Sequence, residues 1–143
     1  MAIRIRGKVL MPGTASGTLL ASDEPLSFWG GYDHTSGSII DRRHPLAGQT
    51  AAGRILAIPF TRGSSSTTAV LLEAIKTGTA PAAIVTTAPD SFFALAAIVA
   101  DEMYSRALPL ILVSEDDFRK LTSGADARID EEGLIEVDSV APF

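Results

Sequence analysis

The alternation of apolar and polar positions divides the chain into short strand-like runs and stretches with helical spacing. Five apolar runs have the length and composition of strands, at residues 3–10, 17–21, 54–59, 82–86 and 110–113. The last three are short and almost wholly apolar, which is typical of strands buried on both faces of a parallel sheet. Pro12-Gly13 marks a turn after the first run.

Each of the last three runs is followed by a stretch that predicts a helix, over residues 64–77, 89–106 and 114–124. In the first helix, Leu71, Ala74 and Ile75 share one face, and Gly78 follows as a C-terminal glycine. The third helix starts with Glu115-Asp116-Asp117, whose negative charges suit the positive end of a helix dipole.

The order of these elements predicts the fold class. The middle of the chain reads βαβαβα, and such units normally form a parallel layer with right-handed crossovers. Near the end, residues 128–130 and 134–137 flank the turn Glu131-Glu132-Gly133, which predicts a hairpin. We therefore expect one α/β domain over residues 1–143, with a mixed sheet, a βαβαβα middle and a β-rich flank.

Residues 22–53 form a long, mostly irregular connection, which in a compact domain is usually functional or hides an element. It contains the chain's two histidines, His34 and His44, together with Asp33. Their spacing matches no established zinc pattern, so surface loop residues are the preferred interpretation. The pair Phe28-Trp29 is either buried core or an anchor for a partner surface.

Composition excludes several classes of protein. The formal net charge is −5, which argues against a nucleic-acid partner. The chain has no cysteine, so it offers no disulfide and no thiolate ligand to a metal or an iron–sulfur cluster. No stretch approaches the roughly 18 apolar residues of a membrane span, and the N-terminus lacks an unbroken apolar core, so we expect no membrane partner and a cytoplasmic location.

Residues 61–68, TRGSSSTT, place five hydroxyl residues in succession where a strand gives way to a helix. A helix start presents unpaired N–H groups and partial positive charge, which favour an anion. One serine is enough to cap the helix, and Gly63 permits close approach of the backbone to a ligand. A serine-rich cap and a ligand site are both open interpretations, but no lysine follows for a nucleotide-binding P-loop.

Several motifs together resemble the small subunit of aconitase X, a divergent branch of the aconitase superfamily. They are residues 25–31 (PLSFWGG), 37–41 (GSIID), 44–46 (HPL), 53–56 (GRIL), 62–66 (RGSSS) and 78–84 (GTAPAAI), in this order. The resemblance extends over nearly the whole chain, and it implies the swivelling β/β/α fold of that family.

The resemblance also implies a hydro-lyase that is active only with a large subunit. It assigns the catalytic base to Ser64, and contacts with the substrate to Arg62, Gly63, Ser65 and Ser66. An iron–sulfur cluster or iron is expected on the large subunit, with no metal or cofactor bound by this chain. Ser66 stands where the superfamily motif has an arginine that grips a substrate carboxylate, which argues against a tricarboxylic substrate.

Two substrates are associated with this family, cis-3-hydroxy-L-proline and mevalonate 5-phosphate. The low charged fraction of 20% is unlike that of thermophiles, which favours the hydroxyproline enzyme over the archaeal one. A non-catalytic module that binds an anion, and a purely structural subunit, are the alternatives from other classes.

Overall fold

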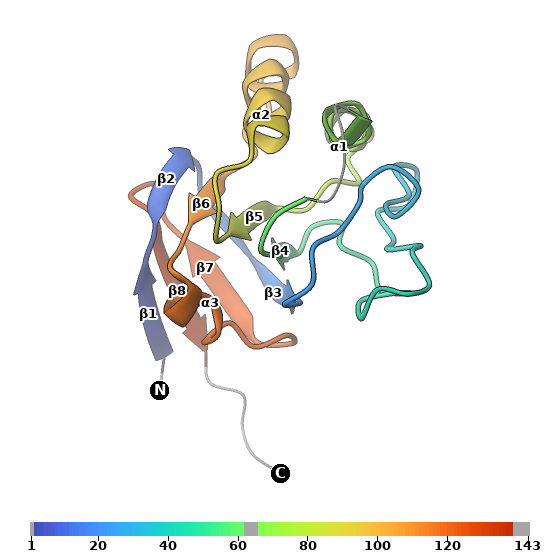
Figure 1. Ribbon diagram of the computed structural model, residues 1–143. Coiled ribbons are helices and arrows are strands. Elements are labelled where there is room, and N and C mark those ends of the chain that lie inside the picture. The colour runs from blue at the N-terminus through green and yellow to red at the C-terminus, as the bar shows by residue number, and fades with distance from the viewer. Residues whose placement is uncertain (1, 62–65, 139–143) are drawn as a thin grey trace.

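The computed structural model describes residues 2–61 and 66–138 of the chain. In these residues eight strands and three helices follow one another (Figure 1): β1 Ala2–Arg6, β2 Lys8–Met11, β3 Ala15–Ala21, β4 Ile55–Ala57, α1 Ser66–Thr77, β5 Ala83–Thr86, α2 Ser91–Tyr104, β6 Leu110–Leu112, α3 Glu115–Phe118, β7 Asp126–Ile129 and β8 Leu134–Asp138. The strands expected at residues 17–21, 54–59, 82–86 and 110–113, the α1 and α2 helices and the terminal hairpin are thereby confirmed, within a few residues at their ends. Residues 3–10, expected as one strand, instead form two strands, β1 and β2, separated at Gly7.

The strands form one mixed sheet in the order β1-β8-β7-β3-β4-β5-β6-β2. Strands β3, β4, β5 and β6 are parallel, as the βαβαβα pattern predicts, and β1, β8 and β7 form the antiparallel flank with β3. The two outermost strands, β1 and β2, are separated in sequence by Gly7 alone. The sheet therefore curls almost into a barrel (Figure 1).

Gly7 makes this closure possible. Its N–H donates to the Gly133 carbonyl at 2.9 Å, so the chain stays attached to the hairpin as it passes between the strands. A Cβ atom at this position would lie 2.2 Å from Ile111 Cγ2, far inside van der Waals contact. Only a residue without a side chain fits here without displacing the barrel lining.

Successive side chains of the central strands enter two separate cores, since strand side chains alternate between faces. Leu19, Ile55 and Val85 belong to the core inside the barrel, which also contains Phe118 and Leu121. Leu20 and Leu56 point the other way and pack beneath α1 and α2 with the helix face predicted from the spacing of Leu71, Ala74 and Ile75. Figure 1 shows these two helices side by side on that face of the sheet.

Two local predictions are wrong. The third helix ends at Phe118 and not at Gly124, because the Leu121 N–H turns back to the Phe118 carbonyl and Ser123 Oγ accepts the N–H of Ala21. His44 is buried rather than on the surface. Its ring contacts the Glu24 carbonyl at 3.2 Å through Nε2 and accepts the Leu46 N–H at 3.1 Å through Nδ1, so it fastens the irregular segment internally.

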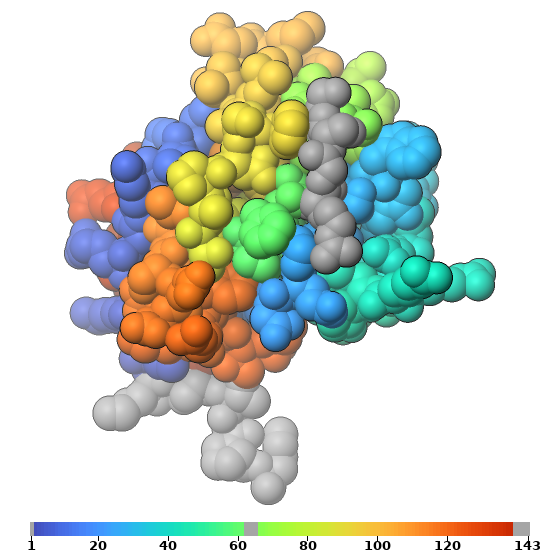
Figure 2. All heavy atoms as spheres, viewed as in Figure 1, coloured from blue at the N-terminus to red at the C-terminus, as the bar shows by residue number. Residues whose placement is uncertain are grey.

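Residues 22–53 remain irregular apart from isolated bridges, but they are well tied to the rest of the domain. The Tyr32 hydroxyl donates to the Thr79 carbonyl at 2.7 Å, and the Thr79 hydroxyl donates to the His34 carbonyl at 2.5 Å. Burial raises the pKa of Tyr32, so its phenol stays protonated and available as this donor. In Figure 2 this segment forms the blue and teal part of the surface beside α1.

Candidate functional site

The candidate site lies where the chain leaves β4 and enters α1, close to the start of α2. The carboxyl ends of parallel strands are the usual place for a site in α/β folds. Thr61 is the last described residue before α1, and it forms a parallel bridge with Leu26 of the irregular segment. Three parts of the chain that are distant in sequence therefore meet at this point.

Asp90 connects the two helix starts. One carboxylate oxygen accepts the N–H groups of Phe92 and Phe93 at 2.9 and 3.2 Å, which caps α2. The other oxygen accepts the backbone N–H of Thr61 at 3.1 Å and also its hydroxyl. A single half-buried carboxylate thus fixes both the start of α2 and the residue that precedes the segment RGSS.

The first turn of α1 is held from the same side. The Thr68 hydroxyl donates to the Phe92 carbonyl at 3.0 Å, and Thr67 is buried. The first turn contains no acidic residue. The positive end of the helix dipole is therefore not compensated by the helix's own side chains, which suits the approach of an anion.

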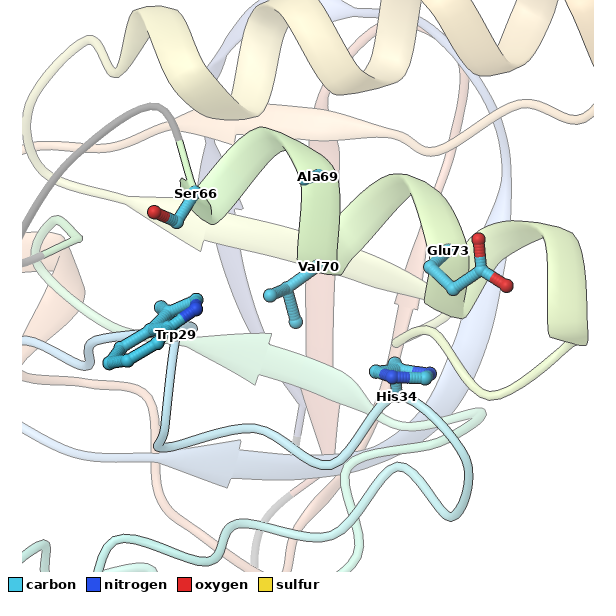
Figure 3. Close-up of a pocket in the computed structure, with 6 residues that line it drawn as sticks. All are labelled: Trp29, His34, Ser66, Ala69, Val70 and Glu73. Atoms are coloured by element: carbon cyan, nitrogen blue, oxygen red, sulfur yellow. The ribbon is translucent and has the colours of Figure 1, made fainter.

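A groove runs from Ser66 along the exposed side of α1 (Figure 3). Its volume is about 480 Å³, and it is lined by Trp29, His34, Ser66, Ala69, Val70 and Glu73. The four helix residues recur at the spacing of one helix face, and Trp29 and His34 face them from the irregular segment (Figure 3). The lining is mainly apolar, with Ser66 at one end and Glu73 toward the other.

The loop that carries Trp29 is built rigidly. Phe28 is fully buried, stacks on Tyr32 at a centroid distance of 5.0 Å and meets Phe93 edge-on at 5.4 Å. Gly31 passes so close to the Ser27 carbonyl that a Cβ atom would lie 2.1 Å from its oxygen. Trp29, by contrast, is 70% exposed. The two residues of this pair therefore differ in their surroundings. Phe28 belongs to the core, so it is excluded as an anchor for a partner, whereas Trp29 lines the groove.

Comparison with known proteins identifies the family of this domain. Residues 4–137 match the sequence model of the aconitase X swivel domain. The chain belongs to the aconitase X family. The structure agrees, because it superposes on the holo form of aconitase X from Thermococcus kodakaraensis with a TM-score of 0.85 and 31% identity, covering 96% of this chain and 99% of that one. The swivelling fold expected from the sequence is therefore confirmed.

The curated proteins that this chain resembles include two kinds of dehydratase. A cis-3-hydroxy-L-proline dehydratase of Pseudomonas aeruginosa is 47% identical over 135 residues, which are 94% of this chain and 23% of that protein. A phosphomevalonate dehydratase small subunit of Thermococcus onnurineus is 35% identical over 137 residues, covering 95% of this chain and 99% of the subunit. The chain thus spans about a quarter of the hydroxyproline dehydratase and nearly the whole small subunit.

The aconitase X resemblance assigned the base to Ser64 and the substrate contacts to Arg62, Gly63, Ser65 and Ser66. Ser66 is described and is the first residue of α1, at one end of the groove. Arg62, Gly63, Ser64 and Ser65 lie outside the described residues.

Two residues at the site were not predicted there. Asp90 is the second residue of the helix predicted over residues 89–106, but its bond to Thr61 leaves no trace in the sequence. Trp29 lies beside α1 through long-range packing, although a tryptophan before two glycines in an aconitase X motif was a usable signal.

The remaining acidic and histidine residues of the irregular segment, which the structure describes in full, form no metal-ligating group, although Glu24, Asp41 and His44 line one pocket together with Arg43. Asp33 accepts the Thr35 and Ser36 hydroxyls, and these bonds, with the Thr35 N–H, lower the pKa of its carboxyl. Within residues 2–61 and 66–138, no three histidine or carboxylate side chains come together to hold a metal ion. No helix in the same residues is long and apolar enough to cross a membrane.

Proposed function

We propose that this chain is the swivelling small subunit of an aconitase X dehydratase that acts, with a large subunit, on cis-3-hydroxy-L-proline. The observation that carries the proposal is the 47% identity to the Pseudomonas aeruginosa dehydratase over 94% of the chain. The match to small subunits along nearly their full length supports a two-subunit enzyme.

In this reaction the carbon that bears the carboxylate loses a proton and the neighbouring carbon loses its hydroxyl, which yields water and a carbon–carbon double bond. We assign the proton removal to Ser64. A serine is a weak base unless its oxyanion is stabilised, and the N–H groups at a helix start provide such stabilisation. Arg62, Gly63, Ser65 and Ser66 are assigned to binding the substrate.

The described residues on either side of residues 62–65 support the assignment of Ser64 as the base. Thr61 is fixed by the Asp90 carboxylate immediately before Arg62 in the sequence, and Ser66 begins α1 two positions after Ser64. A base must be held in place to be effective, since a displacement of about 1 Å can cost a factor of about 100 in rate.

An iron–sulfur cluster does not fit the residues of this chain. Thiolates are the usual ligands of such clusters, and the chain has no cysteine. The described residues also form no group of three histidine and carboxylate side chains suited to a metal. We therefore assign the cluster or iron, with all of its ligands, to the large subunit, and the part of this chain to the base and the substrate contacts.

Two alternatives follow from specific observations. The small-subunit relatives are named for phosphomevalonate, so mevalonate 5-phosphate is the second candidate substrate. The first turn of α1, which contains no acidic residue, also suits a non-catalytic module that binds an anion.

Reconstitution with the cognate large subunit separates these functions. The complex, and each subunit alone, is assayed for dehydration of cis-3-hydroxy-L-proline and of mevalonate 5-phosphate. We expect only the complex to act, with the higher kcat/KM on the hydroxyproline. A higher kcat/KM on the phosphate ester would favour the alternative substrate, and anion binding without any dehydration would favour the module.

The cytoplasmic location stays a prediction, which cell fractionation tests.

A further inference from the structure

The groove beside α1 has a chemical character that distinguishes the two candidate substrates. Its described lining consists of the indole of Trp29, the imidazole of His34, the hydroxyl of Ser66, the small apolar side chains of Ala69 and Val70, and the carboxylate of Glu73. Glu73 repels a phosphate group that enters this groove. A compact ring with a positive charge meets an aromatic face and a negative field.

The position of Trp29 is fixed by the fold and not by its own burial. Phe28 anchors the loop in the core, so the next residue is forced outward beside α1. Figure 3 shows the indole opposite Ser66, at the same end of the groove. Ser66, which we assign to substrate binding, lies at the same end of the groove, so a ring held on the indole is close to this contact.

Resting on the proposed function, we propose that Trp29 is a specificity-determining residue that binds the pyrrolidinium ring of the substrate. The ring of cis-3-hydroxy-L-proline carries a secondary ammonium and apolar CH groups, and both are attracted by the face of an indole. A cation over a tryptophan face contributes about 0.5–2 kcal/mol, depending on how far it is desolvated. Glu73 adds a favourable longer-range charge.

The test compares Trp29→Leu and Trp29→Phe in the assembled complex, with Leu95→Ala as control. Leu95 is also exposed but lies on α2 outside the groove. We expect Trp29→Leu to raise the KM for cis-3-hydroxy-L-proline about 2–30-fold, which is the cation–π range converted to affinity, while kcat changes little. Trp29→Phe should recover much of the loss, and Leu95→Ala should leave KM unchanged.

Two inhibitors isolate the charge. L-Proline keeps the ammonium, whereas cyclopentanecarboxylate has the same ring size and carboxylate without it. We expect L-proline to inhibit the wild-type complex more strongly, and Trp29→Leu to remove most of this difference. An unchanged difference, or a Trp29→Leu variant that only weakens subunit assembly and keeps the wild-type KM at saturating large subunit, overturns the inference. A wild-type complex that does not dehydrate cis-3-hydroxy-L-proline contradicts the proposed function instead.

Discussion

Replacing Asp90 with asparagine separates the two tasks of this residue. An asparagine carbonyl oxygen caps α2 about as well as a carboxylate does. Its amide nitrogen, however, then occupies the position of the oxygen that accepts the Thr61 N–H. Two donors face each other, and the half-buried N–H of Thr61 loses its acceptor. The Thr61 hydroxyl can reverse its bond and accept from the amide, so the backbone N–H carries most of the penalty.

The size of the effect follows from these contacts. A buried donor left without an acceptor costs about 1–3 kcal/mol, so Asp90→Asn should destabilise the domain by about 2 kcal/mol. Asp90→Ala loses the cap as well, for about 1 kcal/mol more. In a chain of this size, 2 kcal/mol corresponds to a Tm lower by about 4–8 °C.

Urea denaturation followed by circular dichroism measures these differences. Thr61→Val, which removes the hydroxyl but keeps the N–H bond, serves as the matched control and should lose only about 0.5–1.5 kcal/mol. Ser114→Ala removes a cap alone, since Ser114 Oγ accepts the Asp117 N–H at the start of α3. If Asp90→Asn lies within about 0.5 kcal/mol of the wild type, the connection between the two helix starts carries no stability and our reasoning is wrong.

Three further outcomes are expected. Phe28→Ala should lower the unfolding free energy by about 3–5 kcal/mol in urea titrations, whereas Trp29→Ala, at an exposed position, should change it by less than about 0.5 kcal/mol. Similar losses for the two variants would contradict the assignment of Phe28 to the core and Trp29 to the surface. Gly7→Ala should cost about 1–3 kcal/mol by thermal unfolding, because the added methyl overpacks the barrel closure, and a neutral result would contradict that closure. In an NMR titration, the Asp33 carboxyl should show a pKa below its ordinary value. Any stability that this carboxylate adds is then present at neutral pH and is lost as the pH falls through the lowered pKa. Thr35→Val should raise the pKa of Asp33, and an unchanged pKa would refute the hydrogen-bond explanation.

Much of the fold is predictable because periodicity reports burial directly. The apolar runs at β4, β5 and β6 are buried on both sides, and the face of α1 with Leu71 and Ile75 follows from helical spacing. The barrel closure is not predictable in this way. Alternation in residues 3–10 gives no information on whether β1 pairs with β8 or β2 pairs with β6, since those pairings depend on distant residues.

The candidate site, like the fold, is only partly predictable from the sequence. The hydroxyl run and the family motif indicate where chemistry is expected, and Ser66, within the helix predicted over residues 64–77, is the first residue of α1. The Asp90–Thr61 contact joins residues 29 positions apart, so no local pattern reveals it. His44 looks like a surface residue in sequence, because its two partners are both backbone groups, which any residue supplies.

The most direct test of the central claim follows the hydrogen on carbon 2 of cis-3-hydroxy-L-proline. The wild-type complex and the Ser64→Ala complex are compared for the rate at which this hydrogen is lost, by NMR in deuterated water, with Ser16→Ala, an exposed serine of β3, as control. Removal of a general base typically costs a factor of about 100–10,000. We predict a loss in this range for Ser64→Ala, with intact assembly and a normal rate for the control. A Ser64→Ala complex that removes the hydrogen at the wild-type rate contradicts the account.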